Sequence, residues 1–256
     1  MFSNIIEIII LSIVQGISEF LPISSSAHLN IVEIIFEFNS NSLMIDVSLH
    51  LGSLLAIVFY FRRELLDLRN NQKLLSLLII GSIPIVIAGY VISSTGLVNL
   101  LENNLKIIAW TTLIFGIILY LADKSKFDKK ISSNLNFKTI LYIGLFQILA
   151  LIPGVSRAGI TITAARLFRF NRFDSSKISF LLAIPAIAGA SVLQLNNAIG
   201  QSFELNYLVL ISITLSFLFS YFTVKFFLDY INKFSLNVFV IYRIIISIIL
   251  FIIIYN

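Results

Sequence analysis

Six long apolar runs occupy most of this 256-residue chain. Each holds roughly twenty residues, the length that an α-helix needs to cross a lipid bilayer. Because the bilayer core offers no water to the backbone, such runs fold as helices that satisfy their own hydrogen bonds. The chain is therefore predicted to be an all-α integral membrane protein with six transmembrane helices in one polytopic domain, 1–256. The runs lie at about 45–61, 74–93, 106–122, 176–195, 206–229 and 236–255.

Two further apolar segments, about 5–38 and 139–170, are interrupted in the middle by "PISSS" and "PGVSRAG". Proline breaks a helix, and glycine and serine permit tight backbone turns, so each segment is predicted to be a helix, a loop and a second helix. Irregular backbone at membrane depth is tolerated only beside protein or a watery cavity. We therefore expect two re-entrant helical hairpins whose tips stop near the membrane midplane.

The basic residues indicate the orientation of the chain. If neither hairpin crosses the membrane, one face carries the loops at 62–73, 123–138, 166–177 and 229–235, and the other carries those at 39–44, 94–105 and 196–205. Of the 18 Lys and Arg residues, all except Lys106, Arg157 and Arg243 lie in or beside the first group. Cytoplasmic loops are rich in Lys and Arg, so the first group is predicted to be cytoplasmic and both termini outside. The net charge of +5 is thus a topology signal, and no nucleic-acid partner is expected.

The same segmentation contains a repeat. Elements that begin near 22, 45, 74 and 106 recur near 153, 176, 206 and 236, a spacing of roughly 131 residues. The two halves, about 1–122 and 139–256, enter the membrane from opposite sides. Inverted-topology repeats of this kind place broken helices and binding sites near the midplane. The two interrupted tips are therefore predicted to meet.

Polar residues gather at these tips. Gln15 and Glu19 are four residues apart and share one helical face, and ionisable groups inside an apolar bundle are candidates for function. The backbone N–H groups of the two turns and the guanidinium of Arg157 suit an anion such as phosphate. A carboxylate and an imidazole can move protons, and a serine hydroxyl can act as a nucleophile. The candidates are Gln15, Glu19, Ser24, Ser25, Ser26 and His28 in the first segment and Ser156, Arg157 and Thr161 in the second.

These residues resemble a known family. "QGISEFLPISSSAH" and "PGVSRAGITIT", together with "SLHLGSLLAIVFYFRREL" and the near-terminal "IYR", are similar to the undecaprenyl-diphosphate phosphatase family, also called the bacitracin resistance protein family. The resemblance implies hydrolysis of a polyprenyl diphosphate lipid to the monophosphate carrier used in cell-wall synthesis. It also implies a multi-pass protein of the bacterial inner membrane, surrounded by membrane lipids, that confers bacitracin resistance. It implies no particular oligomeric state.

The family motifs assign roles to single residues. A Glu or Gln followed by three residues and then a Glu matches Gln15 and Glu19, and a proline–glycine–x–serine–arginine motif matches 153–157. The resemblance implies that the catalytic residues are Glu19, Ser25, His28 and Arg157, and that the diphosphate-binding residues are Gln15, Ser24, Ser26, Gly154, Ser156 and Thr161. Two departures stand out. Gln15 replaces a frequent Glu and cannot act as a base, and Ala158 replaces a frequent Ser.

Two mechanisms are consistent with these residues. Ser25 could attack the terminal phosphate while His28 or Glu19 takes its proton, or water could attack directly while Ser25 only binds. No cofactor is firmly implied. A divalent cation, Mg²⁺ or Ca²⁺, held between Glu19 and the diphosphate would ease the charge, but one carboxylate does not define a metal site. The chain contains no cysteine, which excludes thiolate chemistry.

Alternatives remain open at this stage. A transporter or flippase for a polyprenyl phosphate or a small anion would share the inverted repeats, although it needs no Ser–His–Glu set. Glu19 and Arg157 could form a purely structural ion pair. His50, in a transmembrane helix, is expected to pack or to hydrogen-bond, and Arg243 is expected to have a structural role by extending toward the cytoplasmic interface.

Overall fold

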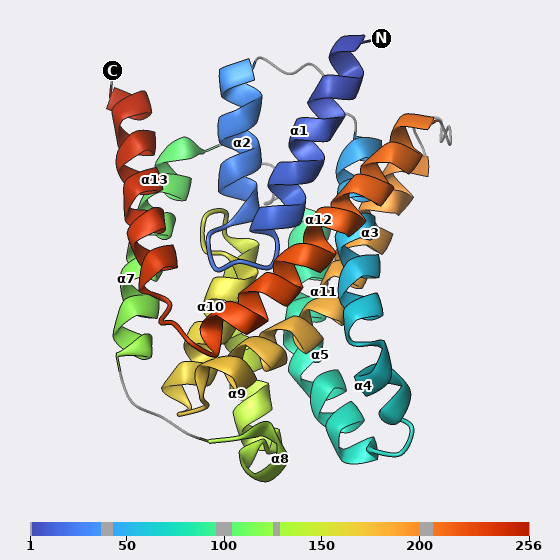
Figure 1. The fold of residues 1–256 in the computed structure, drawn as a ribbon, viewed down its shortest axis with the longest axis vertical. Coiled ribbons are helices and arrows are strands. Elements are labelled where there is room, and N and C mark those ends of the chain that lie inside the picture. Colours follow the sequence, from blue (N-terminus) through green and yellow to red (C-terminus); the bar gives the residue numbers. More distant parts are fainter. Residues whose placement is uncertain (1, 37–42, 96–103, 125–128, 200–206, 256) are drawn as a thin grey trace.

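The computed structural model describes residues 2–36, 43–95, 104–124, 129–199 and 207–255. Within these ranges the chain is helical throughout its regular structure, apart from one isolated bridge between Lys129 and Phe170. The all-α prediction is therefore confirmed. Both chain ends lie at the same end of the helical bundle (Figure 1).

Six described helices are long and apolar enough to cross a membrane. They correspond to the six predicted spans, with ends that differ by a few residues because polar residues can extend a helix beyond its apolar run. The earliest start relative to prediction is at Arg172. Much of the predicted loops at 39–44, 94–105 and 196–205 lies outside the described residues. The six helices are α3 (Leu43–Tyr60), α5 (Gln72–Thr95), α7 (Leu105–Asp123), α11 (Arg172–Ile199), α12 (Tyr207–Ile231) and α13 (Asn237–Tyr255).

Each interrupted segment folds as a pair of helices joined by a turn, as predicted. The first pair is α1 (Phe2–Ser18) and α2 (Ser25–Phe36), and the second is α9 (Phe137–Gln147), extended by the 3₁₀ turn η1 (Ile148–Leu151), and α10 (Arg157–Leu167). In Figure 1 the first pair begins and ends at the end that carries the termini and turns near the middle, whereas α9 approaches from the opposite end. Two short helices, α4 (Arg62–Asp67) and α8 (Ile131–Asn134), were not predicted.

Close packing between the long helices depends on small side chains. A Cβ atom added to Gly52 of α3 would lie 2.5 Å from the carbonyl oxygen of Ile213 in α12, so only glycine permits this approach. Ser53, Ser216 and Ser220 continue the same contact: the Ser53 and Ser216 hydroxyls lie 3.1 Å apart, and the Ser220 hydroxyl donates to Ser53 at 2.9 Å. Small residues and interhelical hydroxyl bonds are the usual means of helix association in a membrane.

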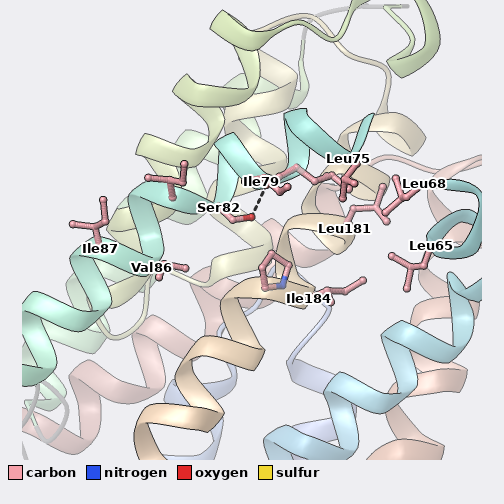
Figure 2. Close-up of a pocket in the computed structure, with 12 residues that line it drawn as sticks. Leu65, Leu68, Leu75, Ile79, Ser82, Val86, Ile87, Leu181 and Ile184 are labelled. Carbon is pink, nitrogen blue, oxygen red and sulfur yellow. Dashed lines mark hydrogen bonds between the residues drawn. The ribbon is translucent and has the colours of Figure 1, made fainter. Parts of the chain in front are cut away.

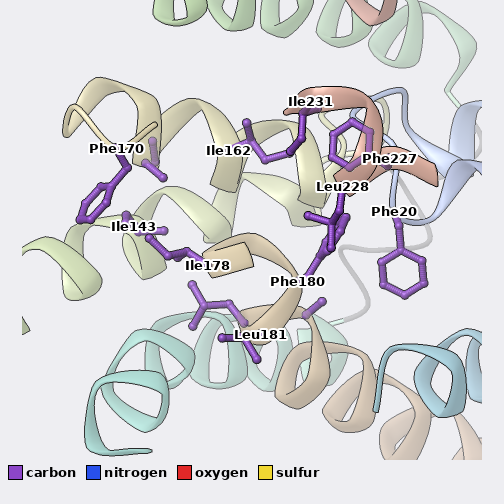
Figure 3. Packing of buried hydrophobic residues seen from close by; sticks show 14 of the residues in the cluster. Phe20, Ile143, Ile162, Phe170, Ile178, Phe180, Leu181, Phe227, Leu228 and Ile231 are labelled. Carbon is purple, nitrogen blue, oxygen red and sulfur yellow. The ribbon is translucent and has the colours of Figure 1, made fainter. Parts of the chain in front are cut away.

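Apolar residues of the first turn are anchored in the core of the bundle. The ring of Phe20, fully buried, meets Phe180 of α11 edge to face at a centroid distance of 5.5 Å, and Phe180 lies 5.8 Å from Phe227 of α12 (Figure 3). Leu21 and Ile23 belong to the same cluster. Aromatic edge-to-face pairs add specific geometry to apolar contact. The apolar core therefore holds the first turn in place, while the polar residues of the turn remain available for other contacts.

A buried carboxylate joins four helices at the opposite end of the bundle from the termini. Asp123 of α7 pairs with Arg166 at 3.1 Å and with Arg172 at 2.8 Å, and its second oxygen accepts a hydrogen bond from the Leu236 amide at 3.1 Å. Sequence reasoning counted both arginines only as topology signals. Their partners are distant in sequence, so only the fold reveals that they also hold the ends of α7, α10, α11 and α13 together.

The outer surface of the bundle is apolar. Large side chains such as Trp110, Phe222 and Ile252 are more than half exposed, as expected for residues that face lipid. One apolar groove lies between α4, α5 and α11 (Figure 2). Ser82, the one polar side chain among its lining residues, donates to the Leu78 carbonyl of its own helix at 2.7 Å. The groove contains none of the predicted site residues.

Candidate active site

The two turns share one backbone feature: each ends in a serine with positive φ. Ser24 has φ 74° and Ser156 has φ 68°, a left-handed conformation that is uncommon for residues other than glycine. In each case a helix begins at the next residue, α2 at Ser25 and α10 at Arg157. The first N–H groups of a helix have no partner within it and favour an anion. Two helix N-termini thus start at the tips of the two hairpins.

The second turn is pressed against α7. Gly154 has φ 86°, and a Cβ atom there would lie 2.2 Å from the Thr111 hydroxyl and 2.7 Å from the Ile108 carbonyl oxygen. The Thr111 hydroxyl donates to the Pro153 carbonyl at 2.6 Å. Glycine is therefore required at this position both by its backbone angle and by the absence of space. Gly154, predicted to bind the diphosphate, therefore determines the shape of the backbone in the second turn.

The two tips meet, as the sequence predicted, and they do so through an ion pair. Arg157 Nη2 donates to Glu19 Oε1 at 2.9 Å, and the two side chains are only 12% and 7% exposed. The other terminal nitrogen, Arg157 Nη1, is buried and has no hydrogen-bond partner among the described residues. A buried donor without a partner is costly. Arg157 therefore presents one N–H group that a bound anion could satisfy.

The second carboxylate oxygen of Glu19 gathers donors from the first hairpin. Ser25 Oγ donates to Glu19 Oε2 at 3.0 Å, and Gln15 Nε2 donates to the same oxygen at 3.0 Å. Gln15 and Glu19 thus share one face, as predicted. Ser25 is partly exposed whereas Glu19 is buried. The serine hydroxyl therefore has its proton directed at a carboxylate that can accept it.

The two histidines lie in different surroundings. His50 of α3, expected to pack or to hydrogen-bond, has its Nδ1 atom 3.0 Å from Gln15 Nε2 and 3.9 Å from Glu19 Oε2. His28, predicted as a base for Ser25, instead has its ring nitrogens 2.6 Å from the Ser24 carbonyl oxygen and 2.7 Å from the Tyr242 hydroxyl. In this arrangement Glu19 is the carboxylate that meets Ser25. Both His50 and Tyr242 lie in stretches that resemble the family, but neither was among the predicted site residues.

Several predicted binding residues use their hydroxyls locally. Ser156 Oγ accepts a hydrogen bond from the Gly159 amide at 3.1 Å, which caps α10. Thr161 is fully buried; its hydroxyl donates to the Arg157 carbonyl at 2.7 Å and meets Ser179 at 2.6 Å. Ser24 and Ser26 face each other, with their hydroxyls 3.2 Å apart. Of this group, only Ser26 is exposed.

Arg243 does not extend toward the membrane interface, so this expectation is wrong. Its side chain is fully buried in the middle of the bundle. The guanidinium donates to carbonyl oxygens of α7 and of both turns: to Thr112 at 3.0 Å, Gly154 at 2.9 Å, Val155 at 3.1 Å and Pro22 at 3.4 Å. Five N–H donors on one rigid plane allow this arrangement, which a lysine could not make. Arg243 thus joins the two tips.

The site residues do not by themselves fit a divalent cation. The described residues contain no group of three or more His, Cys, Asp or Glu side chains that could hold a metal. Glu19 Oε1 is bonded to a guanidinium, and Glu19 Oε2 already accepts two hydrogen bonds. A cation beside Arg157 would meet like charge. The reaction that we propose for this site therefore includes no metal-dependent step.

Fold and site together define a helical membrane protein in which two interrupted helix pairs meet through a buried Glu19–Arg157 ion pair. The chain belongs to the family described as "Bacitracin resistance protein BacA", whose model matches residues 8–249. Similar proteins named undecaprenyl-diphosphatase occur in Elusimicrobium minutum (38% identity over 96% of this chain and 97% of the relative) and Alteromonas mediterranea (38%, over 94% and 95%). Another, from Prochlorococcus marinus, is 35% identical over 96% of this chain and 97% of its own length.

Proposed function

We propose that this protein removes the terminal phosphate from undecaprenyl diphosphate and so regenerates the monophosphate carrier lipid for cell-wall synthesis. The relatives carry the name undecaprenyl-diphosphatase over nearly their whole length. The six apolar helices suit a protein that meets its substrate in the membrane. Removal of this diphosphate from the membrane would also account for the bacitracin resistance in the family's description.

The main support for the proposal is the terminal nitrogen of the Arg157 guanidinium that has no partner among the described residues. One of its terminal nitrogens is paired with Glu19, and the other is buried without a partner, next to the start of α10 and the hairpin that presents Ser25. An oxyanion of the terminal phosphate would accept from that free N–H group. Phosphoryl transfer needs mainly positioning and neutralisation of charge, which a planar guanidinium and helix N-termini supply.

Glu19 and Ser25 would perform the chemistry. Ser25 Oγ attacks the terminal phosphorus, its proton passes to Glu19 Oε2, and the bridging P–O bond breaks with its electrons on the lipid monophosphate. Water then hydrolyses the phosphoserine and releases phosphate. In the alternative, water attacks directly and loses its proton to Glu19 while Ser25 binds the phosphate. The 3.0 Å contact between Ser25 and Glu19 favours the first route.

We also propose that both hairpins are re-entrant, that the halves form an inverted repeat, and that both termini lie outside the cytoplasm in the inner membrane. The packing pattern supports the repeat: α1 contacts α12 as α9 contacts α5, and α3 contacts α12 as α11 contacts α5. These pairs exchange when the halves are exchanged. The Lys- and Arg-rich loops support a cytoplasmic position for the end that carries α4 and α8.

Phosphate release by the purified protein in detergent tests the proposal. Wild-type protein should release phosphate from undecaprenyl diphosphate. Arg157→Lys keeps the charge but loses the two-pronged geometry, so it should lower kcat/KM by at least about a hundredfold, roughly 2.7 kcal/mol of transition-state stabilisation. Arg157→Ala should lower it further. Arg63→Lys, at an exposed position outside the site, is the matched control and should leave activity unchanged.

Three results would contradict the proposal. Near-normal activity of Arg157→Lys would sink the site, and loss of folding in both Arg157 variants would favour a structural ion pair. A wild-type protein that carries undecaprenyl phosphate across vesicle membranes but releases no phosphate would favour the transporter or flippase.

A further inference from the structure

The imidazole of His28 is held at both nitrogens by groups outside the reacting pair. Nδ1 lies 2.6 Å from the carbonyl oxygen of Ser24, one turn earlier in the chain. Nε2 lies 2.7 Å from the hydroxyl of Tyr242, on α13. The planes of the two rings are nearly parallel, with an interplanar angle of 4° and ring centroids 5.4 Å apart. His28 therefore links the start of α2 to the last helix.

These contacts fix the tautomer of the neutral ring. A carbonyl oxygen can only accept, so the proton must be on Nδ1, where it is donated to Ser24. Nε2 then carries a lone pair, and the Tyr242 hydroxyl is the donor that meets it. The hydroxyl thus selects the tautomer that can bond the Ser24 carbonyl, as second-sphere partners do for other functional histidines.

Ser24 is the residue that needs this support. Its φ of 74° is a left-handed conformation that costs a non-glycine residue energy. The next residue is Ser25, whose hydroxyl donates to Glu19 Oε2 at 3.0 Å. Because the Ser24 carbonyl belongs to the peptide group that leads into Ser25, a hydrogen bond to this carbonyl restrains the direction of the serine hydroxyl.

Tyr242 is well placed to act as a fixed point. The adjacent residue, Arg243, is fully buried and donates to carbonyl oxygens of both turns, so this part of α13 is tied to both tips. Tyr242 itself is 38% exposed. Packing of the tyrosine ring alone would not require the hydroxyl to point toward the bundle, yet the hydroxyl contacts the ring of His28.

We propose that Tyr242 is a positioning residue for the phosphatase reaction and acts through His28. The Tyr242 hydroxyl orients the imidazole, the imidazole holds the Ser24 carbonyl, and the turn presents Ser25 to Glu19. His28 is accordingly a support for the turn and leaves proton acceptance to Glu19. This inference rests on the proposed function, since it concerns how the same serine is aimed.

Tyr242→Phe tests the inference, because it keeps the ring and removes only the hydroxyl. We expect kcat for phosphate release from undecaprenyl diphosphate to fall about tenfold with KM changed less than about twofold, since Arg157 and the binding groups are untouched. Tyr255→Phe, on the same helix and 71% exposed, is the matched control and should have no effect. Unchanged kcat in Tyr242→Phe would overturn the inference while leaving the proposed function intact.

A double-mutant cycle with His28→Gln separates positioning from general packing. If Tyr242 acts through His28, then Tyr242→Phe adds no further loss in the His28→Gln background, whereas independent additive losses contradict the inference. The chain has only two histidines, so ¹⁵N-histidine NMR reads the tautomer directly, with His28 identified by the signal lost in His28→Gln. A wild-type ring protonated at Nδ1 is expected, and one protonated only at Nε2 overturns the inference. A wild-type protein without phosphatase activity would instead remove the proposed function itself.

Discussion

The two hairpin tips share one backbone feature, a serine with positive φ directly before a helix, but they carry different side chains. Each turn ends in a serine with positive φ, Ser24 or Ser156, and a helix begins at the next residue. In the first tip that next residue is Ser25, bonded to a carboxylate, and in the second it is Arg157, a cation. A shared backbone can thus create two anion-attracting helix starts. We propose that the side chain that follows decides which helix start reacts and which binds negative charge.

The serine hydroxyls of the two tips extend this comparison. Ser25 Oγ donates to Glu19 at the meeting point of the tips, whereas Ser156 Oγ accepts from the Gly159 amide within its own helix. We propose that the same residue type serves chemistry in one tip and capping in the other. The family motifs imply a catalytic role for Ser25 and a diphosphate-binding role for Ser156.

The largest difference is expected from the same substitution in each tip. Ser25→Ala should lower kcat by at least about a thousandfold while the protein still binds undecaprenyl diphosphate, because the nucleophile is lost. Ser156→Ala should cost about 1 kcal/mol of stability through the lost cap, with kcat lowered by about tenfold at most. Turnover and thermal unfolding of both purified variants would measure this. A loss of only about tenfold in Ser25→Ala would point to direct attack by water, and a trapped phosphoserine would confirm the serine route.

A second difference concerns how tightly each turn is constrained. Gly154→Ala places a Cβ atom against Thr111 at φ 86°, so we expect the free energy of unfolding to fall by more than about 2 kcal/mol. Gly189→Ala in α11 is the matched control, since nothing lies within 4 Å of its added Cβ atom. That variant should change stability little or raise it slightly. Equal melting temperatures for the two variants would show that the second turn is not held as described.

The smallest effect is expected at Gln15. Gln15→Glu should change kcat/KM by no more than about threefold, under 1 kcal/mol, because the introduced carboxylate can share a proton with Glu19 and has His50 within reach. Gln15→Leu removes the amide donor altogether and should cost more activity than Gln15→Glu. Steady-state kinetics of the two variants decide the matter, and the reverse order would refute the proposed role of this amide.

The spans and the two interrupted helix pairs could be predicted because apolar length and helix breakers act locally, and the repeat of the two halves predicted that the tips meet. The ion pair between Glu19 and Arg157 was only one of the alternatives that the sequence left open. The sequence could not place Arg243, whose partners Pro22, Thr112 and Gly154 lie more than eighty residues away. His50 and Tyr242 were not predicted as site residues because their partners Gln15 and His28 lie on other helices, 35 and 214 residues away. Thr161 was predicted to bind substrate, but its direction is set by Ser179 of a neighbouring helix, which no local pattern encodes.

The central claim is that the first tip supplies the chemistry and the second tip binds the diphosphate. Measuring binding and turnover separately in Glu19→Gln and Arg157→Gln tests this claim most directly. Glu19→Gln removes the proton acceptor and the competitor for Arg157, so it should lose turnover by about a hundredfold or more while the Kd for undecaprenyl diphosphate stays the same or decreases. Arg157→Gln should weaken binding by about tenfold or more and lose turnover as well. If Glu19→Gln keeps its turnover, or weakens binding as much as Arg157→Gln does, the first tip does not supply the chemistry and the account is wrong.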